Sequence, residues 1–99
     1  MIKHGTDNTF NDLIKEKLVI VDFFATWCGP CKMLSPVIDE LSNKYPDITF
    51  VKIDVDECPN ISREYGVMSV PTLLKFEDGN LVDKKIGYLN INDFEKWIS

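Results

Sequence analysis

The chain has 99 residues, 44% of them hydrophobic, and a formal net charge of -5 at pH 7. This length supplies one hydrophobic core and leaves no room for another, so we predict a single domain over residues 1–99. The negative charge opposes binding to phosphate backbones and anionic lipids, so we expect neither nucleic acid nor membrane as a partner. The N-terminal segment lacks the apolar stretch of a signal peptide, and we therefore expect a cytoplasmic protein.

The first half of the chain predicts two helices around a strand. Apolar residues recur at helical spacing from Phe10, which indicates a first helix capped by Asp7 or Asn8. The β-branched and aromatic run over residues 18–24 is typical of a central strand that is buried on both faces. An apolar stripe at helical spacing then predicts a long helix over residues 31–45.

The second half of the chain predicts another strand, a short helix, a hairpin and a final helix. Asp78-Gly79-Asn80 is a strong signal for the turn of the hairpin. The predicted elements are a strand over residues 48–54, a helix over 59–65, strands over 72–76 and 81–86, and a helix opened by Asn90 or Asn92. This order predicts an α/β fold with a central mixed β-sheet flanked by helices on both faces.

The cysteines indicate redox chemistry. Three cysteines are too few, and odd in number, for the disulfide framework of a small secreted domain. Two of them form the segment Cys28-Gly29-Pro30-Cys31, between a predicted strand and a predicted helix. The positive end of a helix favours a thiolate at Cys28, and a second thiol at Cys31 is close enough to break a mixed disulfide. This spacing favours thiol–disulfide exchange.

The residues around this pair resemble the active site of the thioredoxin family. The resemblance is carried by the segment Trp27-Cys28-Gly29-Pro30-Cys31-Lys32 and extends from about Phe10 to Ile98. Further matches follow in the family's order: Val21-Asp22-Phe23, Pro36, Val70-Pro71-Thr72, Asp78-Gly79 and Ile86-Gly87. The resemblance implies the thioredoxin-like fold and the activity of a protein-disulfide reductase, a dithiol electron carrier that reduces disulfides in target proteins.

The resemblance also implies roles for individual residues. Cys28 would be the attacking thiol, Cys31 would resolve the mixed disulfide, and Pro71 would be a cis proline facing the pair. The implied substrate-binding residues are Trp27, Gly29, Pro30, Val70, Pro71 and Gly87. Met68 stands where a basic residue is frequent in the family, and Tyr88 where a small one is. These two departures predict altered partner preferences.

The resemblance further implies which partners the protein has. Disulfide-containing proteins would be its substrates, and a separate thioredoxin reductase, dependent on flavin or ferredoxin, would reduce it again. No cofactor and no metal are expected, and the protein is expected to be a monomer. Pro30 argues against an oxidant or isomerase, because those relatives tend to place histidine before the second cysteine. Glutaredoxin-like chemistry is not favoured either.

Two alternatives assign other roles to the cysteines. Cys28, Cys31, Cys58 and His4 would make a full set of zinc ligands. Against zinc, such knuckles use paired C-x-x-C units on turns, whereas this pair opens a helix. The second alternative is a non-catalytic thioredoxin-fold module within a partner complex, and the intact cysteine pair together with Asp22 argues against it. Cys58 itself is expected to be a bystander thiol.

Asp22 requires an explanation because it interrupts an apolar strand, and Lys52 interrupts the neighbouring apolar run in the same way. One hypothesis is a structural ion pair between the two residues. The other is that burial raises the pKa of Asp22, so that its carboxylate takes the proton from Cys31 during resolution. We favour the second hypothesis, with Lys52 in support of the proton transfer.

Overall fold

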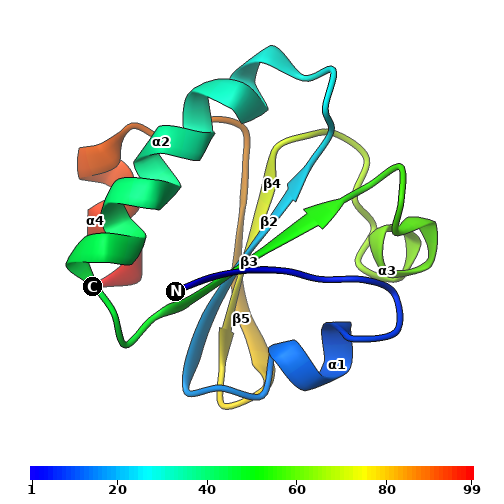
Figure 1. The fold of residues 1–99 in the computed structure, drawn as a ribbon, viewed down its shortest axis with the longest axis horizontal. Coiled ribbons are helices and arrows are strands. Elements are labelled where there is room, and N and C mark those ends of the chain that lie inside the picture. The colour runs from blue at the N-terminus through cyan, green and yellow to red at the C-terminus, as the bar shows by residue number, and fades with distance from the viewer.

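The computed structural model describes all 99 residues. The elements in chain order are β1 (Ile2–His4), α1 (Phe10–Leu13), β2 (Leu18–Phe24), α2 (Gly29–Lys44), β3 (Thr49–Asp54), α3 (Pro59–Glu64), β4 (Thr72–Glu77), β5 (Asn80–Ile86) and α4 (Ile91–Ile98). Figure 1 shows α2 and α4 along one face of the sheet and α1 and α3 along the other. The predicted mixed sheet with helices on both faces is confirmed.

The five strands lie in the order β1-β3-β2-β4-β5. β1, β3 and β2 are parallel, whereas β4 and β5 run antiparallel to their neighbours. β2 occupies the centre with a partner on each side, as its continuous apolar run predicts. The site described below lies where β2 ends and α2 begins (Figure 1).

The alternation of side chains along β2 separates two cores. Val19, Val21 and Phe23 belong to a buried cluster that also contains Phe10 of α1 and Ile61 of α3. The other face of β2 contributes Ile20 to a second buried cluster, formed with α2 and α4: Leu34, Ile38, Leu41, Phe94 and Ile98. Asp22 therefore shares the face that α2 covers, because it is two residues from Ile20.

The N-terminal segment contains a strand that the sequence pattern does not predict. β1 has three residues and pairs with β3 in the register Ile2 to Phe50 and His4 to Lys52. So short a strand, with two polar residues in three, has no recognisable alternation. β1 forms because the backbone N–H and C=O groups at the open edge of β3 are available to pair with it. His4 itself is exposed.

The predicted cap of the first helix is wrong. The N-cap of α1 is Thr9, whose N–H donates to the side chain of Thr6. Asp7 instead binds the start of α3, where its carboxylate accepts the N–H groups of Ile61 at 2.9 Å and Asn60 at 3.4 Å. Unpaired N–H groups at a helix start attract a carboxylate whether it is local or distant in sequence, and here the distant helix is its partner.

Replacing Asp7 with alanine is expected to lower the free energy of unfolding by about 1 kcal/mol, because the first N–H groups of α3 lose their acceptor. Urea unfolding would measure this loss. Asn8→Ala is the matched control, since Asn8 is exposed and makes no such contact; surface substitutions of this kind change stability by about 0.5 kcal/mol or less. Equal effects of the two substitutions would contradict the capping role.

The turn and the last helix agree with their sequence signals. Asp78 and Gly79 have φ values of 51° and 83°, and Glu77 pairs with Asn80 across them. Two consecutive positive φ angles in a two-residue loop are typical of a type I′ hairpin turn. Asn90 caps α4, because its side chain accepts the N–H of Asp93 at 2.9 Å. None of the helices combines the length and apolar character needed to cross a membrane.

Candidate active site

The cysteine pair lies at the junction of β2 and α2. Cys28 is the N-cap of α2, and its Sγ accepts the N–H of Cys31 at 3.2 Å. Pro30 occupies the first turn, where its missing N–H costs no helical hydrogen bond. The two cysteines form a disulfide, with their Cα atoms 5.3 Å apart. The backbone of the helix start thus favours negative charge on the Cys28 sulfur once the bond is reduced.

The segment before β4 lies against the disulfide. Each cysteine is 5% exposed, and Val70 packs beside them. Cys28 Sγ is 3.6 Å from the carbonyl oxygen of Val70, and the Val70–Pro71 peptide bond is cis, as the family resemblance implies. The carbonyl of Pro71 accepts the N–H of Gly87 at 2.8 Å. The segment of Val70 and Pro71 therefore lies against the disulfide and is joined to Gly87 by a backbone hydrogen bond.

Trp27 lies on the surface beside the pair. Its side chain is 70% exposed, which agrees with a docking residue rather than a core aromatic. Its indole N–H donates to the carboxylate of Asp56 at 3.0 Å, and this bond fixes the ring across the end of β3. Asp56 is absent from the sequence-based prediction, because it is separated from Trp27 by 29 residues.

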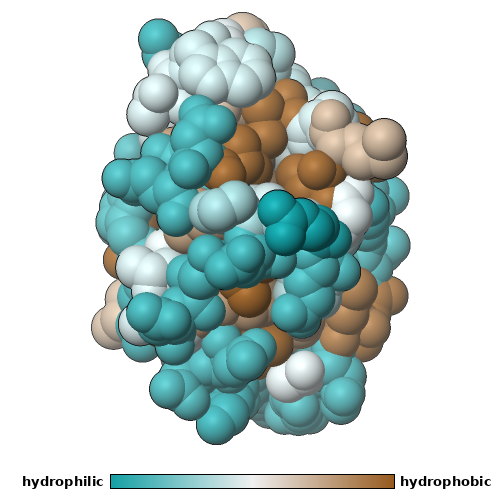
Figure 2. All heavy atoms as spheres, turned by 90° about the vertical axis from the view of Figure 1, so that its right-hand side faces the viewer, coloured by the Kyte–Doolittle hydropathy of each residue, from teal (hydrophilic) through white to brown (hydrophobic).

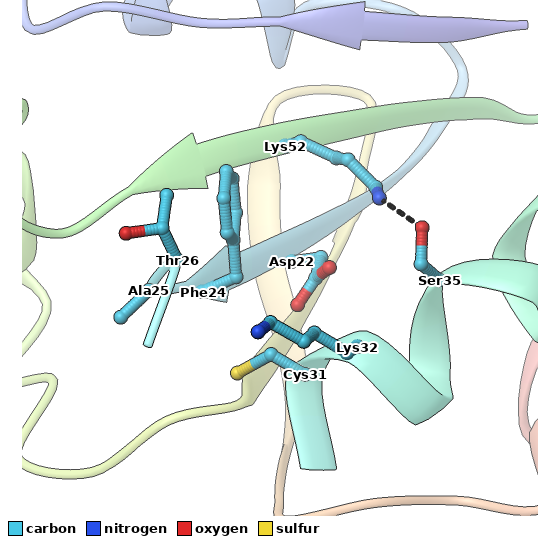
Figure 3. A pocket seen from close by; sticks show the side chains of 8 residues that line it. All are labelled: Asp22, Phe24, Ala25, Thr26, Cys31, Lys32, Ser35 and Lys52. Carbon is cyan, nitrogen blue, oxygen red and sulfur yellow. Dashed lines mark hydrogen bonds between the residues drawn. The ribbon is translucent and has the colours of Figure 1, made fainter. Parts of the chain in front are cut away.

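A pocket of about 240 Å³ lies behind the pair, on the face covered by α2. Figure 3 shows its lining side chains, with Asp22 and Lys52 from adjacent strands and Cys31 and Ser35 from α2. Cys28 is not among the lining residues. The pocket therefore connects the second cysteine of the pair, but not the first, with the buried carboxyl group.

Asp22 is a buried carboxyl group with an incomplete set of hydrogen bonds. It is 3% exposed, and its Oδ1 has no hydrogen-bond partner. Burial raises the pKa of Asp22 to about 7, and the opposing effect of the Lys52 charge is smaller. A carboxyl group with this pKa takes up and releases a proton near neutral pH, as a general base must.

Asp22 and Lys52 do not form the ion pair of the first hypothesis. Their Cα atoms are paired in the register of β2 and β3, yet Lys52 Nζ donates to Ser35 Oγ at 2.9 Å (Figure 3). Ser35 diverts the ammonium group toward α2. Sequence reasoning missed Ser35, although its position four residues after Cys31 places both on one helix face.

Cys58 lies outside this site. It is buried in the cluster on the other face of the sheet, and its Sγ donates to the Gly5 carbonyl at 3.6 Å. Burial, with the nearby carboxylates of Asp7 and Asp54, raises the pKa of the Cys58 thiol and keeps it protonated. No cluster of three or more His, Cys, Asp or Glu side chains is placed to hold a metal ion. The zinc alternative needs Cys58 beside the pair, and the fold instead places Cys58 in the core on the other face of the sheet.

Known proteins match this arrangement along the whole chain. The sequence model of the family described as Thioredoxin matches residues 1–99. The chain belongs to the thioredoxin family. A thioredoxin of Mycoplasmoides gallisepticum is 44% identical over 97 residues, which cover 96% of this chain and 97% of that one. A thioredoxin of Chlamydia muridarum is 42% identical over 99 residues, covering 100% and 97% of the two chains.

The solved structures agree with the sequences. The oxidized form of mitochondrial thioredoxin 3 from Saccharomyces cerevisiae superimposes with a TM-score of 0.90 at 45% identity, covering 98% of this chain and 92% of that one. The predicted thioredoxin-like fold is confirmed. The family and the closely spaced cysteine pair make this thioredoxin family member a dithiol thiol–disulfide oxidoreductase, a redox carrier that reduces protein disulfides. Family membership also implies disulfide substrates and a reductase partner.

Proposed function

We propose that Cys28 is the nucleophile of this reductase and Cys31 the resolving thiol. The observation that carries the assignment is their unequal surroundings. Cys28 Sγ receives the N–H of Cys31 at the start of α2 and lies against the carbonyl of the partly buried Val70. Cys31 instead lines the pocket that contains Asp22. A thiolate belongs on the first sulfur, and a proton transfer belongs beside the second.

The reaction then proceeds in two exchanges. The Cys28 thiolate attacks one sulfur of the substrate disulfide, forms a mixed disulfide and releases the other sulfur as a thiolate, which takes up a proton. Cys31 next loses its proton and attacks Cys28 Sγ, which releases the remaining substrate thiolate. The substrate disulfide has gained two electrons, and the Cys28–Cys31 disulfide has formed. The resolving step needs a base for the Cys31 proton.

We assign that base to Asp22. Its carboxylate lines the same pocket as Cys31, and the pocket is large enough to hold water between them. The pKa of about 7 lets Asp22 accept the proton at neutral pH and release it afterwards. Lys52 supports the transfer because its positive charge stabilises the ionised carboxylate of Asp22. It does so without an ion pair, since its ammonium group is hydrogen-bonded to Ser35.

We expect Lys52→Met to raise the pKa of Asp22 further, because the charge that lowers it is removed while burial remains. The resolving step should then require a higher pH than in the wild type. The pKa is read from an NMR titration of the Asp22 carboxyl carbon. Lys32→Met is the matched control, since Lys32 lines the same pocket but is exposed. An equal rise of the Asp22 pKa in each of the two variants would contradict a specific role for Lys52.

The substrate-binding surface surrounds Cys28. Trp27 provides an exposed aromatic face, and Gly29 and Pro30 are exposed at the start of α2. Val70 offers its backbone to an extended substrate segment, in the manner of an added strand. Pro71 and Gly87 hold this segment in place through the bond between them. The space beside Gly29 is open, since no atom outside its chain neighbours and the backbone of α2 lies within 4 Å of the position of a Cβ there.

We further propose that residues 1–99 act as one domain and as a monomeric electron carrier in the cytoplasm, without a bound cofactor. The composition and charge described above support this setting. Reduction of insulin with dithiothreitol as electron source tests the activity directly. Turbidity from precipitating insulin chains should appear much earlier with the protein than without it. No acceleration would contradict the proposed reductase.

A further inference from the structure

A second pocket lies beside the segment that precedes Cys28 and the segment that ends at Val70. It measures about 150 Å³ and is lined mainly by apolar side chains: Trp27, Val55, Val67, Met68, Ser69 and Val70. Figure 2 shows hydrophobic side chains around a hollow near the upper end of this face, above a largely hydrophilic surface. No residue is shared between this pocket and the one that contains Asp22.

The pocket is continuous with the site of disulfide exchange. Trp27 directly precedes Cys28, and the Val70 carbonyl is 3.6 Å from Cys28 Sγ. A substrate segment that lies extended along Val70 directs every second side chain to the same face, at intervals of about 7 Å. With the substrate cysteine on Cys28, the side chain two residues away therefore points to the pocket. Its apolar lining favours an apolar side chain there.

Met68 forms the outer rim of this pocket. It is 96% exposed, so its thioether is covered by nothing in the chain itself and is accessible to peroxide and to a bound substrate. Oxidation converts a flexible apolar methionine into a polar sulfoxide. On this rim, the change places a polar oxygen against the apolar side chain of the substrate.

We propose that Met68 is an oxidation site that controls specificity: hydrogen peroxide converts it to the sulfoxide and weakens docking of substrates with an apolar side chain two residues from the reacting cysteine. The proposal rests on Cys28 as the nucleophile. In the oxidation, the O–O bond of peroxide breaks, one oxygen bonds to Met68 Sδ, and the other leaves as water. Sulfur loses the two electrons that peroxide gains.

The test uses the oxidised protein, in which Cys28 and Cys31 are protected as their disulfide during peroxide treatment and Cys58 is buried. Met33→Leu leaves Met68 as a target, and Met68→Leu leaves Met33, which is 61% exposed on α2 outside the pocket. Met1 is common to both variants. Mass spectrometry identifies the sulfoxides before the disulfide is reduced and kinetics are measured.

The substrates are short peptides whose single cysteine is bonded to a coloured aromatic thiol. They carry Leu or Ser two residues from the cysteine, on either side, or Leu one residue away. Peroxide treatment of Met33→Leu should lower kcat/KM about fivefold for a peptide with Leu two residues away, the size of one significant interface contact. The rate with free cysteine bearing the same leaving group should not change. Met68→Leu should keep its own rates after the same treatment.

The proposal would be overturned if peroxide treatment of Met33→Leu lowered kcat/KM equally for the Leu and Ser peptides, or lowered it for neither. An equal loss in peroxide-treated Met68→Leu would also overturn it, because the sensitive site would then be elsewhere. Failure of the underlying mechanism has a different signature: a Cys28→Ser variant would react with the free cysteine conjugate as fast as the wild type. The two ideas can therefore fail separately.

Discussion

Cys28→Ser is expected to abolish disulfide reduction, whereas Cys31→Ser is expected to attack substrates and remain bound to them. A serine hydroxyl at position 28 is not ionised near neutral pH, so the first exchange does not start. A serine at position 31 leaves the first exchange intact and removes the second. Insulin reduction measures the first variant, and non-reducing gels with mass spectrometry detect the covalent adducts of the second.

The double variant with serine at both positions is the control for adduct formation, because Cys58 is then the one thiol left. Its burial and raised pKa predict no adducts in the folded protein. Residual reduction by Cys28→Ser, or a Cys31→Ser variant that accumulates no adducts, would contradict the assigned roles. Adducts in the double variant would instead identify Cys58 as a competing nucleophile.

Asp22→Asn is expected to slow resolution of the mixed disulfide by up to about 100-fold, the lower range of general-base effects. Attack by Cys28 should keep its wild-type rate, because Asp22 does not share a pocket with Cys28. Stopped-flow kinetics separates the two steps. The wild-type resolving rate should rise as pH increases through about 7, where Asp22 ionises, and Asp22→Asn should lack this rise. Wild-type resolution by the Asn variant would leave Asp22 a structural residue only.

The same substitution should also change stability with a defined pH dependence. Folding raises the pKa of Asp22 from 3.8 to about 7, so the folded state binds the proton more tightly than the unfolded state. The wild-type free energy of unfolding therefore falls as pH rises from about 4 to about 7 and stays constant above pH 7. The fall is at most about 4 kcal/mol, because the pKa of Asp22 differs by about three between the unfolded and folded states. Asp22→Asn should remove this fall and be more stable than the wild type at pH 8. Urea unfolding at pH 5 and pH 8 measures both effects.

Sequence patterns predict the long elements well because each is set by its own residues. The continuous apolar run of β2, the stripe of α2 and the Asp78-Gly79 turn all have local physical causes, and all three form as predicted. β1 and the cap of α1 were not predictable in this way. β1 depends on the open edge of β3, and Asp7 is drawn to a helix that begins more than fifty residues later, at Pro59.

The site shows the same difference between features set by local sequence and features set by contacts in the fold. The spacing of Cys28 and Cys31 is visible in the sequence because the pair stands between a predicted strand and a predicted helix. Asp22 is visible because it interrupts an apolar run. The contacts that set their chemistry are not visible. The Ser35–Lys52 bond, which replaces the expected ion pair, and the bond from Trp27 to Asp56 join segments whose approach only the fold determines.

The absence of any shared residue between the two pockets at the disulfide makes substrate choice and acid–base chemistry separately adjustable. The rim formed by Trp27 and Met68 does not border the pocket that Lys32 and Ser35 of α2 line, so a partner bound at that rim need not contact the residues to which we assign the proton transfer. Engineering can use this division. On the proposed assignments, libraries confined to residues 67–69 are expected to change which proteins are reduced, and the pH profile assigned to Asp22 is expected to stay the same from one redesigned variant to the next.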